Sequence, residues 1–379
     1  MTDLLEQIKV SGLREYGLYP EEMAQKLAAC HGARALVVAL NNADTEGAAL
    51  TLLRRDAGKV FAGMKSVAQI IGTECKVLHI PAYADDLFRS LKTEAEADNI
   101  ELVCGIVDVR ADKDCCLTHI VTMVELSDIT SGSYVPGVYV SVNGNDIRKI
   151  NPDTRIGDLL GEHVKGVQTG YEVRTAEALQ ITVAQANIEN GVLRAITDAD
   201  CMIDLVQKKL LTSRKYSCGK CVFCREGLLQ LEAVQKDVTS DKGSWDGLRL
   251  SGEIGEAMAF STACSMGQNA ARIALSAMKV YKEEYEEHIR KHRCVADSCI
   301  AFRKVYVDPF ACTGCAGCRS VCPTGAIDGA VGYIHIIFDH WCTKCGDCIP
   351  VCLAQAIRLT TGRIPRLPDR MLRVGRFTE

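Results

Sequence analysis

Residues 312–323 read CTGCAGCRSVCP, and residues 342–352 repeat the same cysteine spacing as CTKCGDCIPVC. Each run has the form C-x2-C-x2-C-x3-C. Such runs bind four-iron clusters in two-cluster ferredoxins, where three cysteines hold one cluster and the fourth crosses over to the other. A zinc ribbon would need pairs of cysteines rather than runs of three. The sequence therefore predicts two [4Fe-4S] clusters and a protein that transfers electrons.

The crossing of the fourth cysteine assigns a ligand set to each of these two clusters. The first cluster is expected on Cys312, Cys315, Cys318 and Cys352. The second cluster is expected on Cys342, Cys345, Cys348 and Cys322.

A third cluster is expected further upstream. Cys218, Cys221 and Cys224 lie within SCGKCVFCREG, and Cys264 follows later in the chain. Three thiolates at this spacing occupy one face of a cubane, and a remote cysteine completes the set. A zinc site with one remote ligand is the alternative interpretation of these four residues. The segments 199–211 and 253–281 have apolar residues at helical spacing, so the cluster is expected at the end of a small helical bundle.

The upstream motif resembles the NADH-oxidising flavoprotein subunit of respiratory complex I and of soluble hydrogenases, including electron-bifurcating ones. That family carries S-C-G-K-C-x-P-C-R-E-G, preceded by D-x-x-C-M-x-D. Residues 217–227 and 198–204 match these motifs, with Phe223 in place of the proline. Residues 135–140 (VPGVYV) and a following Asn-Gly hairpin signal resemble the family's soluble-ligand-binding β-grasp domain. Hydrogenase-type members also end in a two-cluster ferredoxin, so the resemblance covers most of the chain.

The N-terminal third departs from this family where its members bind FMN and NADH. The family loop S-G-L-R-G-R-G-G-A-G-F-P-T-G has glycines that let backbone N–H groups approach the flavin phosphate. Residues 11–23 read SGLREYGLYPEEM, so Glu15, Tyr16 and Leu18 replace three residues of the loop, two of them glycines, and residues 21–22 add two carboxylates. A later family segment, G-A-G-A-Y-I-C-G-E-E-T-A-L, is missing. We therefore expect a degenerate α/β domain without FMN or NAD, and an FMN site rebuilt from other residues is the alternative.

The junction before the ferredoxin has two interpretations. Hydrogenase-type relatives have a similar H-x5-C-x4-C junction and a histidine seven residues before the last cluster run. The corresponding residues here are His288, Cys294, Cys299 and His335. Two thiolates and two imidazoles would form a closed tetrahedral zinc site that fixes the orientation of the ferredoxin, and His292 or His340 could replace either imidazole. The other interpretation is a pair of reduced surface cysteines with unrelated histidines.

The remaining cysteines and the C-terminal tail carry weaker signals. Small buried thiols are the expectation for six cysteines, namely Cys30, Cys75, Cys104, Cys115, Cys116 and Cys201. The arginine-rich tail after Thr360 is expected to be solvated. The alternative for the tail is an arm that binds an acidic partner subunit.

Composition excludes several classes of protein. A formal net charge of −4 with 24% charged residues gives no reason to expect nucleic acid or membrane binding. The first ten residues, MTDLLEQIKV, lack the apolar core of a signal peptide, and no stretch approaches the roughly 18–20 apolar residues of a membrane helix. Twenty cysteines in this context favour reduced thiols in a cytoplasm, and exposed low-potential clusters favour an anaerobe.

The expected fold class is an α+β multidomain chain. Residues 1–130 are expected to form the degenerate FMN/NADH-binding-like α/β domain, and residues 131–196 the β-grasp domain. Residues 197–290 are expected to form a helical-bundle domain with one [4Fe-4S] cluster. Residues 291–360 are expected to form a zinc-tethered ferredoxin-like domain with two clusters, followed by the basic tail, residues 361–379.

The function that follows is electron transfer inside a soluble multi-subunit oxidoreductase complex. Electrons would pass between a flavin- or NAD(P)H-linked partner and a ferredoxin, terminal reductase or hydrogenase. The sequence offers no general base, nucleophile or substrate pocket, so the chain is not expected to turn over a substrate by itself. Two alternatives remain: an FMN-containing NADH dehydrogenase subunit, and a peripheral subunit of a membrane ferredoxin:NAD oxidoreductase.

Overall fold

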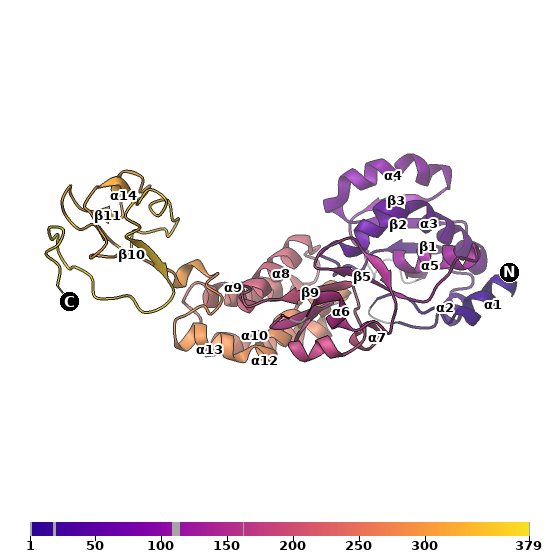
Figure 1. The fold of residues 1–379 in the computed structure, drawn as a ribbon. Coiled ribbons are helices and arrows are strands. Elements are labelled where there is room, and N and C mark those ends of the chain that lie inside the picture. The colour runs from indigo at the N-terminus through magenta and orange to yellow at the C-terminus, as the bar shows by residue number, and fades with distance from the viewer. Residues whose placement is uncertain (1, 18–19, 108–113, 162, 379) are drawn as a thin grey trace. The chain divides into compact units, whose positions relative to one another are not determined.

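The computed structural model describes residues 2–17, 20–107, 114–161 and 163–378, so Leu18 lies outside the described part of the chain. The chain is a mixed α/β protein (Figure 1). It forms two compact units. The first comprises Met1–Asp198, Leu205–Val234 and Asp246–Lys282, and the second comprises Ala199–Asp204, Gln235–Trp245 and Glu283–Glu379.

A four-stranded parallel sheet organises the start of the first unit, with strand order β3-β2-β1-β4. The strands are β1 (Ala35–Ala39), β2 (Lys76–Ile80), β3 (Glu101–Cys104) and β4 (Cys115–His119). Its helices are α1 (Thr2–Ser11), α2 (Met23–Ala29), α3 (Ala48–Ile71), α4 (Asp85–Ala97) and α5 (Ile120–Thr130), with a short 3₁₀ turn, η1, at Ala82–Ala84. All five residues of β1 are buried, as expected for a parallel strand whose two faces are both covered.

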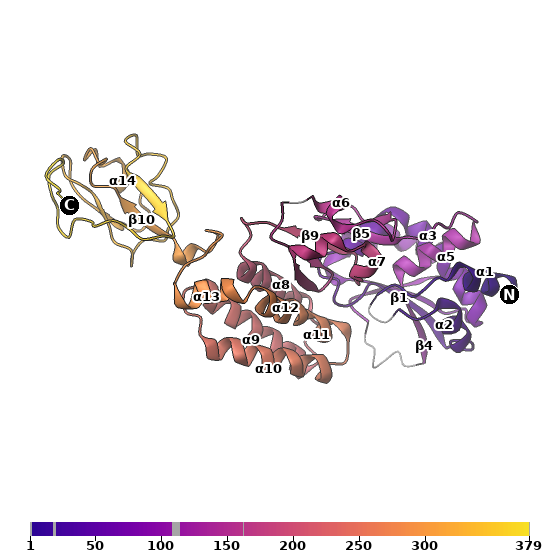
Figure 2. The ribbon, with the colours of Figure 1, turned by 60° about the horizontal axis from the view of Figure 1, so that its bottom comes forward.

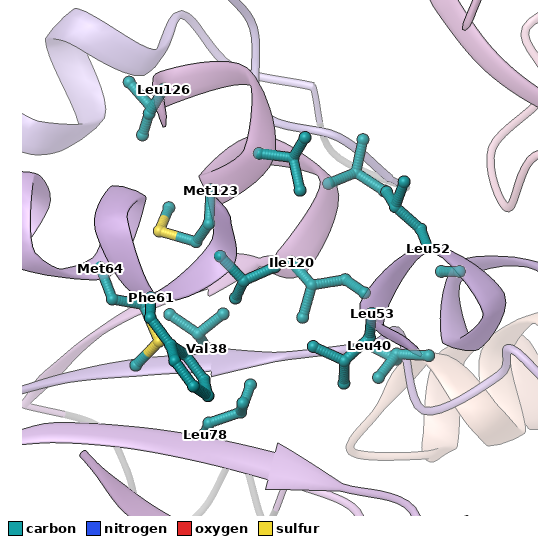
Figure 3. Close-up of a cluster of buried hydrophobic side chains, with 14 of the residues drawn as sticks. Val38, Leu40, Leu52, Leu53, Phe61, Met64, Leu78, Ile120, Met123 and Leu126 are labelled. Atoms are coloured by element: carbon teal, nitrogen blue, oxygen red, sulfur yellow. The ribbon is translucent and has the colours of Figure 1, made fainter. Parts of the chain in front are cut away.

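The core of this domain lies where α3 and α5 pack on the sheet (Figure 3). Phe61 and Met64 of α3, Met123 of α5 and Leu78 of β2 are at most 1% exposed and point into one cluster. Burying each such side chain contributes about 1.5–3 kcal/mol. Gly63 permits the close approach of the helices, because a Cβ atom at this position would lie 2.1 Å from the carbonyl oxygen of Met123.

A mixed five-stranded sheet with order β6-β5-β9-β7-β8 follows in the same unit. Its strands are β5 (Val138–Val142), β6 (Arg148–Ile150), β7 (Gly166–Thr169), β8 (Glu172–Thr175) and β9 (Val192–Ile196). The turns between them include α6 (Ile156–Leu160), η2 (Ala176–Gln180) and α7 (Val183–Ala186). Asn143 adopts a left-handed φ of 53° beside Gly144 at 78°, which is the backbone that the Asn-Gly signal predicts for the β5–β6 hairpin.

Six helices come next: α8 (Met202–Tyr216), α9 (Val222–Thr239), α10 (Trp245–Ser261), α11 (Ser265–Ala270), α12 (Arg272–Val280) and α13 (Lys282–Arg290). Figure 2 shows α9 and α10 side by side. A Cβ atom on Gly227 of α9 would lie 2.5 Å from the sulfur of Met258 on α10, so this glycine also permits close packing.

The helical pattern predicted over residues 253–281 is not continuous. Helix α10 ends at Ser261 and α11 begins at Ser265, because Cys264 has extended backbone angles (φ −138°, ψ 168°). The hydroxyl of Thr262 donates to the carbonyl of Met258 across the last turn of α10. The break places Cys264 at a helix junction, where its thiol is not confined to a helix surface.

The C-terminal module of the second unit is built as two similar halves. Strand β10 (Lys304–Val307) pairs with β13 (Ile357–Thr360), and β11 (Ile327–Asp328) pairs with β12 (Ile336–Ile337), both antiparallel. The short helices η3 (Ile300–Phe302) and α14 (Gly317–Ser320) complete the module. Left-handed backbone recurs at matching places in the two cysteine runs: Gly314 (φ 70°) corresponds to Lys344 (φ 58°), and Gly325 (φ 65°) to Gln355 (φ 49°).

Candidate iron–sulfur and metal centres

The four cysteines expected to hold the upstream cluster lie together. Cys224 lies in the first turn of α9 and Cys264 immediately precedes α11. Burial raises the pKa of the Cys224 thiol, and the neighbouring thiolates of Cys264, Cys221 and Cys218 raise it further. The Cys224 thiol therefore keeps its proton until a metal displaces it. This donor set fits a four-iron cluster.

The loop between Cys218 and Cys224 is braced by its own residues. Gly219 has φ 71°, which brings its carbonyl oxygen within 3.2 Å of the Arg225 guanidinium. Arg225 also pairs with Glu226 at 2.8 Å. The hydroxyl of Ser217 lies 3.4 Å from the sulfur of Cys224. Because Cys218 is exposed, one edge of the site faces solvent.

The structure also brings together the residues of the first ferredoxin set. Burial raises the pKa of the Cys318 thiol to about 11, and the charges of Cys312, Cys315 and Cys352 add to this rise. Cys352 belongs to the second sequence run, so the crossing of the fourth cysteine is present in the geometry.

The second ferredoxin set has the same arrangement. Burial raises the pKa of the Cys348 thiol, and Cys342, Cys345 and Cys322 contribute further. Here Cys322 comes from the first run, which completes the exchange.

Backbone amides donate to cluster cysteines at equivalent places in the two halves. The N–H of Ala326 donates to the sulfur of Cys322 at 3.3 Å, and the N–H of Ala356 donates to the sulfur of Cys352 at 3.2 Å. Such N–H···S contacts stabilise negative charge on the thiolate and so influence the reduction potential of a bound cluster.

A fourth group of metal-binding side chains lies at the junction before the ferredoxin. In the described ranges this group consists of Cys201, His288, Cys294 and Cys299, which are all buried and whose ligand atoms lie within 4.8 Å of one another. Three of these four residues were predicted from the sequence. The fourth, Cys201, precedes α8 and was expected only as a small buried thiol.

The distances within this group suit a tetrahedral ion. The sulfur of Cys201 lies 3.4 Å from His288 Nε2 and 3.5 Å from the sulfur of Cys299, and Cys299 lies 3.7 Å from the same nitrogen. A tetrahedron with Zn–S near 2.3 Å and Zn–N near 2.0 Å has edges of roughly 3.5–3.8 Å. His288 Nδ1 lies 2.8 Å from the carbonyl oxygen of Glu284, which makes Nδ1 the donor and leaves Nε2 available as a ligand.

His335 is not part of this group, which corrects the sequence-based expectation. Its ring is buried against Gly329, where a Cβ atom would lie 2.6 Å from the imidazole. His335 therefore occupies the connection between β11 and β12 within the ferredoxin module. The two substitutes named from the sequence also lie elsewhere, since His292 pairs with Asp241 at 2.6 Å and the ring of His340 lies against Trp341.

The N-terminal loop that differs from the family motif is filled by its own side chains. One carboxylate oxygen of Glu15 accepts from the N–H of His119 at 2.9 Å and from the hydroxyl of Thr122 at 2.6 Å. The other oxygen lies 3.2 Å from Lys26. The ring of Tyr16 lies over His119, with centroids 4.8 Å apart. A buried carboxylate thus already occupies donors at the N-terminus of α5, which makes a poor fit for a flavin phosphate in this loop.

Two cavities border the upstream cysteine group within the first unit. One of about 260 Å³ has Cys218 and Asp44 in its wall, and another of about 400 Å³ has Cys264 and Glu15. The smaller cavity lies at the carboxyl ends of β1, β2 and β3, the edge where open α/β sheets bind ligands. Asp44 is 4% exposed, its Oδ1 has no hydrogen-bond partner among the described residues, and burial raises its pKa to about 7.

The other unassigned cysteines differ in burial. Cys116 is buried, as expected, whereas Cys75 and Cys104 are exposed and the expectation for those two is wrong. Cys75 immediately precedes strand β2, and Cys104 is the last residue of strand β3.

Comparison with known protein families identifies two iron–sulfur regions. Residues 204–288 match the NADH-ubiquinone oxidoreductase-F iron-sulfur binding region. Residues 304–353 match a 4Fe-4S dicluster domain. The chain therefore carries the two kinds of iron–sulfur domain that the cysteine spacing predicted.

Individual relatives agree with this assignment. The NADP-reducing hydrogenase subunit HndC of Solidesulfovibrio fructosivorans is 29% identical over 202 residues, which cover 51% of this chain and 41% of that protein. An NADH-quinone oxidoreductase subunit of Streptomyces coelicolor is 31% identical over 117 residues, covering 31% and 26%. A crystal structure of an NAD⁺-reducing [NiFe]-hydrogenase in the H2-reduced state superposes with a TM-score of 0.64 at 16% identity, covering 76% of this chain and 62% of that chain.

These comparisons confirm the resemblance to the flavoprotein subunits of complex I and of soluble hydrogenases. The matched region spans less than half of the curated relatives' length. The superposition confirms a shared mixed α/β fold. None of the helices in the described ranges combines the length and apolar character that a membrane span requires.

Proposed function

We propose that this chain is an electron-transfer subunit of a multi-subunit oxidoreductase complex, with three [4Fe-4S] clusters. The observation that carries this proposal is the gathering of twelve cysteines into three groups of four, two of which exchange a cysteine between sequence runs. Each bound cluster would accept and release one electron at a time. The protein's own part is to hold the thiolates, donate N–H···S hydrogen bonds and exclude water.

The complex would join two redox partners. One end would receive electrons from, or return them to, a flavin- or NAD(P)H-linked subunit, and the other would exchange them with a ferredoxin, reductase or hydrogenase. The relatives support this placement because one is named as a subunit of an NADP-reducing hydrogenase. We assign the complex to the cytoplasm of an anaerobe, because exposed cluster cysteines such as Cys218 suit a reducing, oxygen-poor compartment.

The N-terminal domain would act as a scaffold without flavin. Its support is the carboxylate of Glu15, which sits where the family loop has a glycine and binds donors at the start of α5. A phosphate would have to displace this buried carboxylate and approach a second one, Glu21, which also pairs with Lys26. Both steps oppose the binding of an anion.

One zinc ion would complete the junction, held by Cys201, His288, Cys294 and Cys299. Four protein ligands leave no open position, so the ion would be structural rather than catalytic. It would fix the junction to the ferredoxin module. We retain the division into four modules at residues 130, 196 and 290 as the functional organisation, with the zinc group at the last boundary.

The test is to purify the holoprotein anaerobically and to measure iron, zinc and flavin per polypeptide. Three four-iron clusters correspond to twelve irons, and we expect one zinc and no flavin. A zinc-type site at Cys218 would instead leave about eight irons and a second zinc. Irons well below eight would overturn the proposal.

The zinc ligands are tested by a pair of variants. Cys201→Ser should lower zinc to near zero while iron remains at the wild-type level, because the cluster cysteines are separate. His335→Gln is the matched control and should retain zinc. Retention of zinc in the first variant and its loss in the second would restore the sequence-based ligand set.

An FMN-containing NADH dehydrogenase subunit is the second candidate. The cavity of about 260 Å³ beside Cys218 favours it, since Asp44 offers an unpartnered carboxylate oxygen at its wall. Stoichiometric FMN together with NADH-dependent reduction of a dye would establish this candidate in place of the first.

A further inference from the structure

The C-terminal segment is largely exposed, as expected from its composition, but it is also attached to the ferredoxin module. It pairs with the ferredoxin module, where Tyr333 and Arg373 form an antiparallel bridge. The N–H of Ile334 donates to the carbonyl of Leu372 at 2.8 Å, and the N–H of Val374 donates to the carbonyl of Gly332 at 3.1 Å. Figure 1 shows this segment, in yellow, running along the module to the C-terminus.

Apolar side chains fasten the segment beside the loop of the first ferredoxin cluster. Leu372 and Phe377 pack against the core that contains Cys312 and Cys318. The ring of Phe377 meets that of Phe310 edge to face, with centroids 5.4 Å apart. We call residues 363–378 the basic strap.

The cluster loop is itself tied to the residues that the strap pairs with. The N–H of Gly332 donates to the carbonyl of Gly314 at 3.0 Å, and these two glycines are in close backbone contact. Strap, glycine turn and cluster loop therefore form one packed layer, and the charge of the strap is held at a fixed place near the cluster.

The outer face of the strap concentrates positive charge. Its five arginines, Arg363, Arg366, Arg370, Arg373 and Arg376, are all exposed, and its only acid is Asp369. Within the described ranges none of the five forms an ion pair. Residues 304–362 hold four basic and four acidic side chains, whereas residues 363–379 hold five arginines against Asp369 and Glu379. Side chains alone, without bound clusters, therefore give residues 304–379 a formal charge of +3, all of it from the C-terminal segment, in a chain whose total is −4.

We propose that the basic strap is the docking surface for an acidic one-electron carrier protein, which exchanges an electron with the cluster on Cys312, Cys315, Cys318 and Cys352. This inference rests on the electron-transfer function proposed above. One electron leaves the reduced cluster, which is oxidised, and the carrier is reduced by one electron, with no bond or proton transferred. The reverse transfer has the same balance.

Two features favour a protein carrier over other polyanions. The strap pairs with the Gly332 turn, which contacts the loop of a cluster whose ligand Cys315 is exposed, so a partner held by the strap lies near that cluster. The arginines also stand on an irregular segment that is paired to the module at Leu372 and Val374, and not on the amphipathic helix that a membrane surface binds. Opposite charges on the two partners steer encounter and register, which is what electron transfer between proteins requires.

The test uses the full-length holoprotein and a variant with Arg363→Gln, Arg366→Gln, Arg370→Gln and Arg376→Gln. Arg373 is kept because its guanidinium packs over the ring of Tyr333. The matched control removes four exposed basic residues of the first unit through Lys9→Gln, Arg89→Gln, Lys92→Gln and Arg249→Gln. Iron and zinc contents are measured for all three proteins, so that loss of a cluster is detected separately.

The first readout is binding of an acidic two-iron ferredoxin at low and high salt. We expect the strap variant to bind roughly tenfold more weakly at low salt than either wild type or control, and the difference to vanish at high salt. The second readout is the rate at which the dithionite-reduced protein reduces ferricyanide or hexaammineruthenium(III). The ratio of the ferricyanide rate to the hexaammineruthenium(III) rate should be roughly tenfold lower in the strap variant than in wild type, because ferricyanide is an anion and the ruthenium complex is a cation.

Equal behaviour of the strap and control variants in both readouts would overturn the docking surface. Sedimentation of wild type with phosphatidylglycerol vesicles, without binding of the ferredoxin, would assign the strap to a lipid surface and overturn it as well. An iron content well below eight in the wild-type protein would instead contradict the proposed function, and the binding readout would still report on the strap.

Discussion

At the scale of single residues, the carboxylate of Glu15 occupies the hydrogen-bond donors of the N-terminal domain that a phosphate would otherwise use. It satisfies two donors near the start of α5 and pairs with Lys26. Glu15→Ala should therefore leave the His119 N–H and the Thr122 hydroxyl without an acceptor and destabilise α5 by about 2 kcal/mol. Hydrogen–deuterium exchange of amides 115–130 in the holoprotein measures this loss.

Added phosphate tests whether the donors that Glu15 occupies can bind an anion. Phosphate should slow exchange in Glu15→Ala, because an anion can occupy the vacated donors, and should have no effect on wild type. Glu21→Ala is the matched variant, since Glu21 pairs with the same lysine but is 57% exposed. Equal effects of the two substitutions would contradict a special role for Glu15.

The buried carboxyl of Asp44 predicts a pH dependence. Burial raises its pKa from 3.8 to about 7, so between these values the folded chain holds a proton that the unfolded chain has released. Stability therefore falls as pH rises through this window and stays lower above pH 7, by roughly 4 kcal/mol at most. Asp44→Asn should be neutral at pH 4 and stabilising at pH 8, as measured by urea unfolding followed by circular dichroism. A gain of equal size at both pH values would show that ionisation of Asp44 is not the cause.

The sequence predicts a metal ligand well when the other ligands of its site lie close to it in the chain, and poorly when they lie far away. The cluster cysteines are recognisable because three of each four ligands lie on one short loop, so local spacing encodes the site. Cys201 is far along the chain from His288, and only the folded junction brings them within 3.4 Å. A signal for it was present, because Cys201 stands in the family segment at residues 198–204.

At the scale of elements, the packing of α3 on α5 is the contact on which the N-terminal domain depends. Gly63→Ala would place a methyl group 2.1 Å from a backbone oxygen of Met123, which cannot move without shifting α5. We expect a loss of about 3 kcal/mol. Gly58→Ala in the same helix is the control, because its Cβ would lie 3.6 Å from a carboxylate oxygen of Glu94, an ordinary contact. That change should stabilise by about 0.5–1 kcal/mol through helix propensity, and thermal unfolding distinguishes the two signs.

The sequence predicts a helix or strand well where the spacing of apolar residues is regular and no cluster ligand breaks the element. The helical spacing predicted over residues 199–211 is such a case, because helix α8 covers Met202–Tyr216 without a break. The helix expected over 253–281 failed because apolar spacing continues across the break at Cys264. The five arginines of the strap predict a solvated tail, whereas Leu372 and Phe377 pack it against the ferredoxin core.

At the scale of the whole molecule, the compact units cut across the helices. Helices α8, α9 and α10 each contribute residues to both units, so a reading of the sequence in consecutive domains could not give this division. Each group of cysteines nevertheless lies entirely within one of the two units. Cys218, Cys221, Cys224 and Cys264 belong to the first unit, and the zinc group and both ferredoxin sets belong to the second.

This separation predicts that the upstream cluster can be lost alone. Cys264→Ala removes the remote ligand, so the holoprotein should retain about eight irons and its zinc. Reductive titration should then take up two electrons in place of three, because the ferredoxin pair has its own ligands and core. Cys75→Ala, at an exposed cysteine outside the cluster groups, should leave iron and electron count unchanged. If Cys264→Ala also emptied the ferredoxin, cluster assembly would couple the two units, and the independence inferred from their separate cores would be wrong.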